Sequence, residues 1–280
     1  MYLKKRHAQE KLCDYEKDMN RQELSARTIH KYLTDIMQWL EQVEEPVITK
    51  EMLISYKRKL AGKYKAATVN SKIISVNRYI KWLGFADLTV RTRTERIQLP
   101  NVLDKMITKE NYFAMLKFAR DTGRWKICYI MKTIAGTGLR IGELKYVTVQ
   151  AITDGCTQIW NKRKYRTIYF SELLCEELLR YCNMIGIEQG VVFPGRTEGE
   201  VIASATVWKD LKYIATSIGI PKDTVFPHSF RHLFAKNYME RIGDITELAD
   251  ILGHSRLETT WIYTKTTSAE KRKRLELLDL

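Results

Sequence analysis

The chain has few of the features that mark secreted, metal-stabilised or membrane-spanning proteins. Its 280 residues include five cysteines, and no two of them are spaced as Cys-x-x-Cys. Few, scattered cysteines in a chain of this length argue against a disulfide framework or a structural zinc site and fit a reducing cytoplasm. No apolar run approaches the roughly 18 residues of a membrane span. No apolar segment follows the basic residues 4–6, so we expect no secretion signal and no membrane partner.

Positive charge, by contrast, is abundant. Lys and Arg total 47 against 33 Asp and Glu, which gives a formal net charge of +14 and a pI near 9.5. Such a charge attracts polyanions, with nucleic acid as the first candidate and a membrane surface as the second. Both the first hundred residues and the rest of the chain carry the excess, which favours a polyanion held from two sides.

Apolar residues at helical spacing dominate the sequence and predict a mainly α fold with one small antiparallel β-sheet. Ser25 is a predicted N-cap for one such helix. The segments 146–149, 157–160 and 166–170 are short and rich in β-branched and aromatic residues, which favours strands. We expect a helical domain over residues 1–88, a basic linker over 89–105 where helical periodicity fades, and a second domain with a C-terminal tail over 106–280.

A glycine-rich turn precedes Arg140, within Thr-Gly-Leu-Arg-Ile-Gly-Glu-Leu at residues 137–144. Glycines let the backbone turn sharply before a helix that we predict to begin near Leu139. At the start of such a helix, Arg140 lies where free N–H groups and the helix dipole already favour an anion. A helix-capping turn with a surface arginine is the alternative explanation.

A basic run, Asn-Lys-Arg-Lys-Tyr-Arg at residues 161–166, falls in a predicted β-turn. A lysine at the tip of a turn can reach into a groove and donate a proton there. Lys162 and Lys164 are both candidates for this role, and a solvated charged turn is the alternative.

The third cluster, His-Ser-Phe-Arg-His at residues 228–232, follows a proline. His228 and Arg231 are three residues apart and therefore share one helical face. Arginine holds a phosphate through two hydrogen bonds, and histidine moves a proton near neutral pH. His232 falls on another face, and we interpret it as structural. A polar helix N-terminus after Pro227 is the alternative for the whole cluster.

The fourth cluster runs from Leu252 through a tyrosine at position 263. Gly253 is predicted to end one helix, and Ser255 and Glu258 have capping-box spacing for the next. This spacing places His254 in a tight turn between helices and Tyr263 two turns into the second of them. Filling of the hydrophobic core is the alternative role for Tyr263.

In this order the four clusters resemble the motifs of the tyrosine recombinase (phage integrase) family, which includes Xer recombinases and transposon integrases. The resemblance spans residues 106–264 and implies one catalytic set: Arg140, Lys162, His228, Arg231, His254 and Tyr263. The helical region before it resembles the family's core-binding domain. The lysine turn departs from the family pattern because both of its glycines are missing. Aligning Arg166 with the family's arginine makes Lys162 the catalytic lysine and leaves Lys164 as the fallback.

The resemblance implies a two-domain C-clamp around double-stranded DNA and strand exchange through a 3′-phosphotyrosyl bond. Tyr263 would attack, Arg140 and Arg231 would hold the phosphate with His254, His228 would accept a proton, and Lys162 would protonate the leaving 5′-oxygen. We expect no cofactor and no metal, because arginines neutralise the phosphate and the sequence lacks the carboxylate cluster of a two-metal nuclease. The expected assembly is a tetramer on two DNA sites, with the tail docking in cis or in trans and an accessory directionality protein as a further partner.

Two other functions fit parts of the pattern. A type IB topoisomerase uses similar tyrosine chemistry, but the Xer-like spacing argues against it. A DNA-binding accessory protein with an inactive fold is the second, and the filled catalytic positions argue against that. Integration, excision, inversion and resolution of DNA dimers all remain open outcomes, among which we favour the recombinase of a mobile element.

Overall fold

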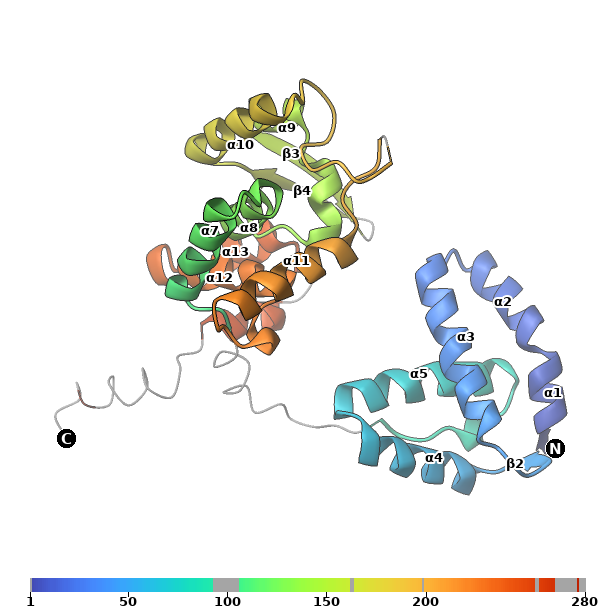
Figure 1. Cartoon of the computed structure of the whole chain (residues 1–280). Coiled ribbons are helices and arrows are strands. Elements are labelled where there is room, and N and C mark those ends of the chain that lie inside the picture. The colour runs from blue at the N-terminus through green and yellow to red at the C-terminus, as the bar shows by residue number, and fades with distance from the viewer. Residues whose placement is uncertain are drawn as a thin grey trace. The chain divides into compact units, whose positions relative to one another are not determined.

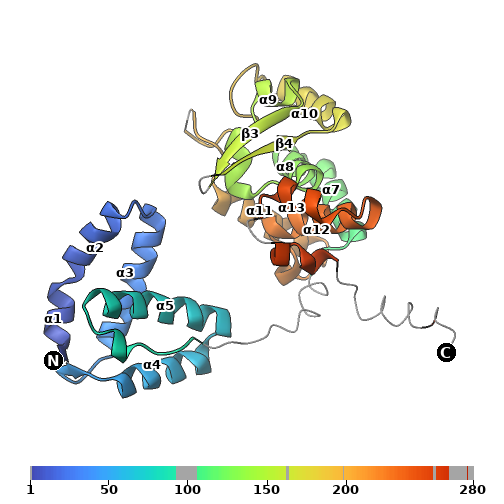
Figure 2. The ribbon, with the colours of Figure 1, turned by 180° about the vertical axis from the view of Figure 1, so that it is seen from behind.

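The computed structural model describes residues 2–92, 106–161, 164–197, 199–254, 257–264 and 276. The chain divides into two compact units, Met1–Ile97 and Gln98–Leu280. Helices predominate in both, as Figure 1 and the reverse view in Figure 2 show. The prediction of a mainly α fold with a small antiparallel sheet is therefore confirmed. Within the described ranges, no helix is long and apolar enough to cross a membrane.

The first unit consists of short helices at its start and three longer ones. Its elements are β1 (Leu3–Lys4), α1 (Lys5–Glu10), α2 (Leu12–Arg21), α3 (Ala26–Glu41), β2 (Val47–Ile48), α4 (Lys50–Lys63), α5 (Ala66–Trp82) and η1 (Ala86–Leu88). The predicted cap at Ser25 is confirmed, because its side chain accepts a hydrogen bond from the Thr28 backbone N–H. Strands β1 and β2 form a two-residue antiparallel pair that the sequence pattern did not predict.

A buried carboxylate joins α3 to α5. Asp35 is 5% exposed and accepts hydrogen bonds from Lys31 on its own helix and from Lys72 and Ser75 on α5. Burial alone would raise the pKa of Asp35, but these hydrogen bonds outweigh it and lower the pKa. The pairing fixes the two helices around the aromatic core of this unit, in which Tyr15, Trp39 and Tyr79 are fully enclosed.

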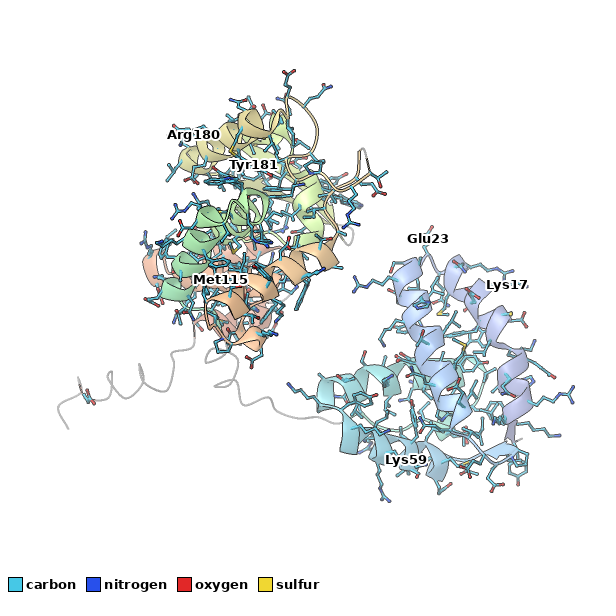
Figure 3. The ribbon with its side chains drawn as sticks, in the orientation of Figure 1. Lys17, Glu23, Lys59, Met115, Arg180 and Tyr181 are labelled. Carbon is cyan, nitrogen blue, oxygen red and sulfur yellow. The ribbon has the colours of Figure 1, made fainter. Side chains whose placement is uncertain are left out.

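The second unit packs helices around a larger core and carries one β-hairpin. Its elements are α7 (Lys109–Asp121), α8 (Trp125–Thr137), η2 (Ile141–Tyr146), α9 (Val149–Thr153), β3 (Cys156–Asn161), β4 (Lys164–Tyr169), α10 (Glu172–Ile185), α11 (Ser204–Ser217), η3 (Lys222–Thr224), α12 (Pro227–Arg241), α13 (Ile245–Leu252), η4 (Leu257–Thr259) and η5 (Trp261–Tyr263). Met115 of α7 and Tyr181 of α10, labelled in Figure 3, are both buried in this unit.

Strands β3 and β4 pair antiparallel from Cys156 opposite Tyr169 to Asn161 opposite Lys164. The predicted hairpin is thus present, but the strand expected over 146–149 is wrong. Tyr146 ends the 3₁₀ helix η2, and Val149 begins α9. The reason is a cap: the Thr148 side chain accepts a hydrogen bond from the Ala151 N–H, so a β-branched residue here starts a helix instead of a strand.

The turn after α8 also differs from the expectation of a helix starting near Leu139. Helix α8 ends at Thr137, and Gly138 follows in the left-handed conformation with φ of 66°. Arg140 is extended, and the next helical turn, η2, begins only at Ile141. Gly138 also lies against neighbouring side chains: a Cβ there would approach Phe234 Cδ1 to 2.5 Å and Leu252 Cδ2 to 2.9 Å.

Replacing Gly138 by alanine is therefore expected to be costly for two separable reasons. The left-handed backbone costs a non-glycine residue roughly 1–2 kcal/mol, and the clash adds roughly 1–3 kcal/mol of overpacking. Gly123→Ala is the matched control, since Gly123 has the same φ of 66° but nothing within 4 Å of an added Cβ. Urea unfolding measures both variants. Equal losses of unfolding free energy would show that the contact with Phe234 and Leu252 is unimportant.

Candidate active site

Arg231 lies at the centre of the site, on the first turns of α12. It is 3% exposed and donates to the carbonyl oxygens of Gly138 and Leu252, the latter at 2.5 Å. These carbonyls belong to the C-terminal ends of α8 and α13, where the negative ends of helix dipoles stabilise a cation. Burial and the charges of Arg140 and Arg166 lower the pKa of Arg231 to about 9, so the side chain is still a cation at neutral pH.

A buried carboxylate organises the other two arginines. Glu143 of η2 is 4% exposed and accepts hydrogen bonds from the Arg140 backbone N–H at 2.6 Å and from its guanidinium at 3.0 Å. Arg166 of β4 pairs with the same carboxylate and also donates to the Ile251 carbonyl oxygen. Burial would raise the pKa of Glu143, but the Arg140 backbone bond and the two positive charges lower it. Through Arg166, Glu143 thereby connects to both the hairpin and the end of α13.

That turn carries His254. Gly253 ends α13 in the left-handed conformation, as the sequence predicts, and an added Cβ there would lie 2.6 Å from Arg166 Cδ. Arg140 donates to the Gly253 carbonyl oxygen at 3.4 Å. The His254 Nε2 lies 3.2 Å from the Arg231 guanidinium, and its Nδ1 lies 2.8 Å from the Thr260 hydroxyl. Since a guanidinium can only donate, Nε2 accepts from Arg231 and Nδ1 carries the proton.

Burial, with the charges of Arg231, Arg140 and Arg166, lowers the pKa of His254 to about 4. The imidazole is therefore neutral at pH 7 and binds the arginine as a hydrogen-bond acceptor. Among the described residues of the site, the positive charge is therefore carried by arginines and not by His254.

Tyr263 lies in η5 rather than two turns into a regular helix, so that expectation is wrong. Ser255, the expected cap, lies outside the described residues. The Tyr263 side chain is 6% exposed and packs with Ala235, Leu248 and Leu252 of α12 and α13. Its hydroxyl is not enclosed by apolar groups, however, because it lies 2.5 Å from Nδ1 of His232. Burial raises the pKa of Tyr263 to about 12, while Arg231 and Arg140 act to lower it. Removing its proton at pH 7 therefore costs about 7 kcal/mol.

The contact with His232 corrects another expectation. The sequence interpretation gave His232 a structural role on a different face of the helix, and the structure places it against the hydroxyl of Tyr263. Its position directly after Arg231 was the signal available in the sequence. Sequence reasoning also left Glu143 and Thr260 out of the candidate set. Thr260 is fully buried and polar, and it orients His254.

His228 lies one helical turn before His232, with ring centroids 6.5 Å apart. Its side chain is exposed, and it makes no hydrogen bond with any residue that the structure describes. Partial desolvation and the charges of Arg231 and Arg140 lower its pKa. The structure thus brings Arg140, Arg231, His254 and Tyr263 around one turn, with His228 at the exposed edge.

The lysine of the candidate site is not placed. Lys162 lies outside the described residues, and Lys164 is described only as the first residue of β4. The tail after Thr264 also lies outside them, apart from Glu276. Among the residues that the structure does describe, no three His, Cys, Asp or Glu side chains are grouped to hold a metal ion.

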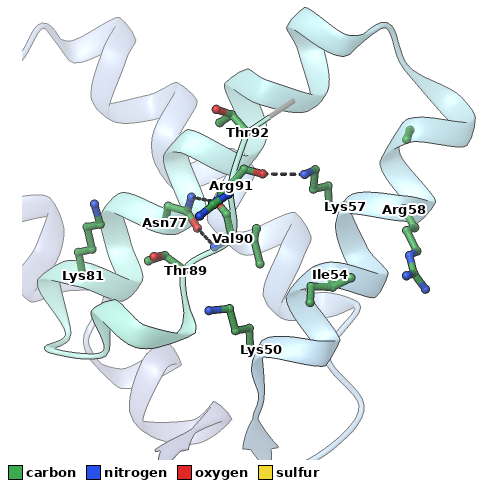
Figure 4. A pocket seen from close by; sticks show the side chains of 11 residues that line it. Lys50, Ile54, Lys57, Arg58, Asn77, Lys81, Thr89, Val90, Arg91 and Thr92 are labelled. Atoms are coloured by element: carbon green, nitrogen blue, oxygen red, sulfur yellow. Dashed lines mark hydrogen bonds between the residues drawn. The ribbon is translucent and has the colours of Figure 1, made fainter. Parts of the chain in front are cut away.

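A second candidate surface is a basic groove in the first unit, which Figure 4 shows from close by. It measures about 830 Å³ and is lined by five cationic side chains: Lys50, Lys57, Arg58, Lys81 and Arg91. The Asn77 side chain donates to the Val90 carbonyl oxygen at 2.7 Å and accepts from the Val90 N–H at 3.1 Å. Lys57 donates to the Arg91 carbonyl oxygen at 2.6 Å. No described acidic residue lines this groove.

Comparison with known proteins identifies the same two regions. Residues 105–270 match the family model described as the phage integrase family, and residues 13–84 match that of the phage integrase N-terminal SAM-like domain. Tyrosine recombinase XerA of Pyrococcus furiosus is 28% identical over 263 residues, which cover 91% of this chain and 89% of the relative. Tyrosine recombinase XerD of Halalkalibacterium halodurans is 26% identical over 273 residues, covering 89% and 90%.

Solved structures share the fold. A lambda integrase dimer bound to a core site is 17% identical with a TM-score of 0.73, and the match covers 95% of this chain and 96% of that one. The XerH site-specific recombinase in a post-cleavage complex with a palindromic difH substrate is also 17% identical with a TM-score of 0.73, covering 91% and 81%.

The buried Glu143 predicts a large stability loss and a defined pH dependence. Glu143→Gln leaves Arg140 and Arg166 without their carboxylate, and breaking a buried pair costs about 3–5 kcal/mol. Because the folded-state pKa of Glu143 lies below its ordinary value of 4.5, its contribution is complete above that value and is lost as the pH falls through the folded-state pKa. Unfolding free energies measured across this acidic range should therefore fall less steeply in the variant than in the unaltered chain.

Glu176→Gln is the control, because Glu176 is 70% exposed and pairs with Arg180 at 3.8 Å. It is expected to cost less than about 1 kcal/mol. Similar losses in the two variants would contradict the central position assigned to Glu143.

Proposed function

This chain belongs to the phage integrase family, and from that premise we propose that it is a site-specific DNA recombinase acting through a 3′-phosphotyrosyl intermediate. One observation carries the proposal: Arg140, Arg231 and His254 converge on the turn at Gly253, and the charges of both arginines act on Tyr263. A tyrosine hydroxyl beside two fixed guanidinium groups suits attack on a phosphodiester.

The proposed reaction exchanges one phosphate ester for another. The Tyr263 oxygen bonds to phosphorus and the bond to the 5′-oxygen breaks, so the strand leaves with a 5′-hydroxyl. Charge that develops on the nonbridging oxygens is held by Arg140 and Arg231, both aligned before the substrate arrives. His254, oriented by Thr260, donates to the same phosphate once the bound anion favours a proton on its Nε2. His228 is exposed at the edge of the site, and we assign it a position next to the bound DNA.

Because ester energy is conserved in the protein–DNA bond, a second 5′-hydroxyl reverses the step without an external energy source. An isoenergetic reaction also has no direction of its own. We therefore include an accessory directionality protein among the expected partners and propose a tetramer on two DNA sites as the assembly. We also propose that residues 1–88 and 106–280 are the two domains and that they close as a clamp over the duplex.

The basic groove of the first unit supports double-stranded DNA as the partner. Lys50 and Lys57 already donate to carbonyl oxygens of Asp87 and Arg91, which fixes their positions without neutralising their charge. Fixed cations in a groove contact phosphates and set the orientation of the duplex, while leaving base recognition to other residues. We propose that the protein acts in the cytoplasm, where its DNA substrate is found.

A type IB topoisomerase is the alternative enzyme, and the names of the curated relatives do not favour it. A non-catalytic DNA-binding protein would not require a tyrosine hydroxyl held by a neutral histidine beside two arginines.

A nicked suicide substrate that carries the cognate site tests the nucleophile. The unaltered chain is expected to form a covalent DNA adduct that survives denaturing electrophoresis, and Tyr263→Phe is expected to form none while still binding DNA in a mobility shift. Thr264→Ala, at an exposed neighbouring position, is the control for local disturbance. Adduct formation by Tyr263→Phe would assign the nucleophile elsewhere, and relaxation of plasmids without site preference would favour the topoisomerase.

The general acid is tested by Lys162→Ala and Lys164→Ala on two substrates. The variant that lacks the acid should cleave an ordinary strand about 10²–10⁴-fold more slowly. A 5′-phosphorothiolate should restore its rate, because a thiolate leaves without a proton. The other variant should gain no such recovery. Recovery in neither variant would remove both lysines from this role.

A further inference from the structure

His232 holds the reacting atom of the proposed nucleophile. Its Nδ1 lies 2.5 Å from the Tyr263 hydroxyl, and the two ring centroids are 5.5 Å apart. His232 belongs to α12 and Tyr263 to η5, two elements that pack together. The ring of Phe226 packs edge-on against the imidazole, with the two ring centroids 6.4 Å apart.

We propose that His232 is a catalytic residue, the general base that accepts the phenol proton as Tyr263 attacks phosphorus. The inference rests on the proposed function, and it moves the proton-accepting role from His228, where sequence reasoning placed it, to the neighbouring imidazole that contacts the hydroxyl.

The step balances within the groups named. The phenol O–H bond breaks and its proton passes to Nδ1 of His232, while the phenolic oxygen forms the bond to phosphorus. The bond from phosphorus to the 5′-oxygen breaks, and that oxygen takes its proton from the general acid. When the 5′-hydroxyl of a partner strand attacks the phosphotyrosyl phosphorus, its proton returns to the deprotonated general acid. The bond from phosphorus to the tyrosine oxygen breaks, and the imidazolium returns its proton to that oxygen.

The charges around His232 set the direction of the hydrogen bond. The titratable or charged groups near it are His228 and Arg231 on α12, His254 on the turn after α13, and Tyr263 on η5. Burial, with His228 and Arg231, lowers the pKa of His232 to about 4, and burial raises that of Tyr263 to about 12. At neutral pH the hydroxyl therefore donates to a neutral Nδ1.

Because the pKa of Tyr263 is far above that of His232, the proton stays on the tyrosine before DNA binds, and no phenolate–imidazolium pair forms. The proton leaves tyrosine only as its oxygen bonds to phosphorus, when the acidity of the phenol rises sharply. A bound phosphodiester adds negative charge near the imidazole and so makes it a better base. The contact thus becomes productive when DNA is in place.

His228 is less suited to this role. Its ring is exposed, and its centroid lies 6.5 Å from that of His232 rather than against the tyrosine. The hydroxyl would have to leave its present partner before His228 could accept the proton.

The experiment compares His232→Gln with His228→Gln in single-turnover cleavage of the suicide substrate at saturating DNA. Glutamine retains a hydrogen-bonding side chain but does not titrate. The His232 variant is expected to cleave about 10²–10⁴-fold more slowly, with an unchanged unfolding transition and unchanged DNA affinity. A 5′-phosphorothiolate should not restore it, because its defect lies at the nucleophile and not at the leaving group.

Ring-fluorinated tyrosine, incorporated at position 263 alone, supplies the decisive readout. Its lower phenol pKa removes the need for a base, so it should restore cleavage by His232→Gln and should not speed cleavage by His228→Gln. In the otherwise unaltered chain it should change the rate less than about tenfold, since the base already removes the proton. This last arm does not depend on the folding of any variant.

Three results would overturn the inference. Equal cleavage by His232→Gln and the unaltered chain would leave His232 without a catalytic part. Faster cleavage by that variant would show that the contact restrains the tyrosine. Rescue of His228→Gln by the fluorinated residue would return the role to His228. If the unaltered chain forms no adduct at all, the proposed function itself fails, which is a distinguishable outcome.

Discussion

The buried guanidinium of Arg231 is the constraint on which the site depends. Taking a cation out of water is expensive unless its donors are satisfied, and here the partners are backbone carbonyls at the ends of two helices and a neutral imidazole. Carbonyls can take these positions only if α8 and α13 both stop where they do. The left-handed glycines at 138 and 253 stop them, and neither tolerates a side chain without a clash. The glycines of the motifs are therefore part of the arginine's binding site.

The sequence correctly predicted those helix ends and the hairpin that depend on interactions between residues close in the chain. Ser25 caps its helix, Gly253 ends one, and the hairpin forms where β-branched residues gather, because each depends on neighbours within a few residues. The motif order predicted residues that do lie together, since Arg140, Arg231 and His254 meet at one turn, while their catalytic roles and the placement of the lysine stay predictions. The wrong predictions lie where distant contacts or a competing cap decide. The strand at 146–149 gave way to the cap at Thr148, and the helix near Leu139 gave way to a turn whose carbonyl serves Arg231 from 93 residues away.

His232 is another residue whose main contact comes from a segment distant in the sequence. His232 directly follows Arg231 and was therefore expected on another face, but it also lies one helical turn after His228, so the two histidines are neighbours on the surface of α12. The contact that the sequence did not predict comes from a second element, η5, which packs on α12 and brings the Tyr263 hydroxyl to His232. Periodicity along one helix cannot show what a later segment places against it. A histidine adjacent to a buried arginine is a candidate for function whichever way it points.

The charge states of the site residues explain how cleavage is confined to a bound substrate. His232 and His254 are both neutral at pH 7, while Arg231 is a cation that attracts an anion. Tyr263 is protonated and packed against Ala235, Leu248 and Leu252, so its oxygen is a poor nucleophile towards anything that lacks a phosphate to hold it. A phosphodiester that binds between the arginines favours attack by Tyr263 in each of these respects. It pairs their charge and makes the imidazoles more basic, and it offers the phenol a phosphorus to bond as its proton departs. Burial of the nucleophile and activation by substrate are thus two consequences of one arrangement.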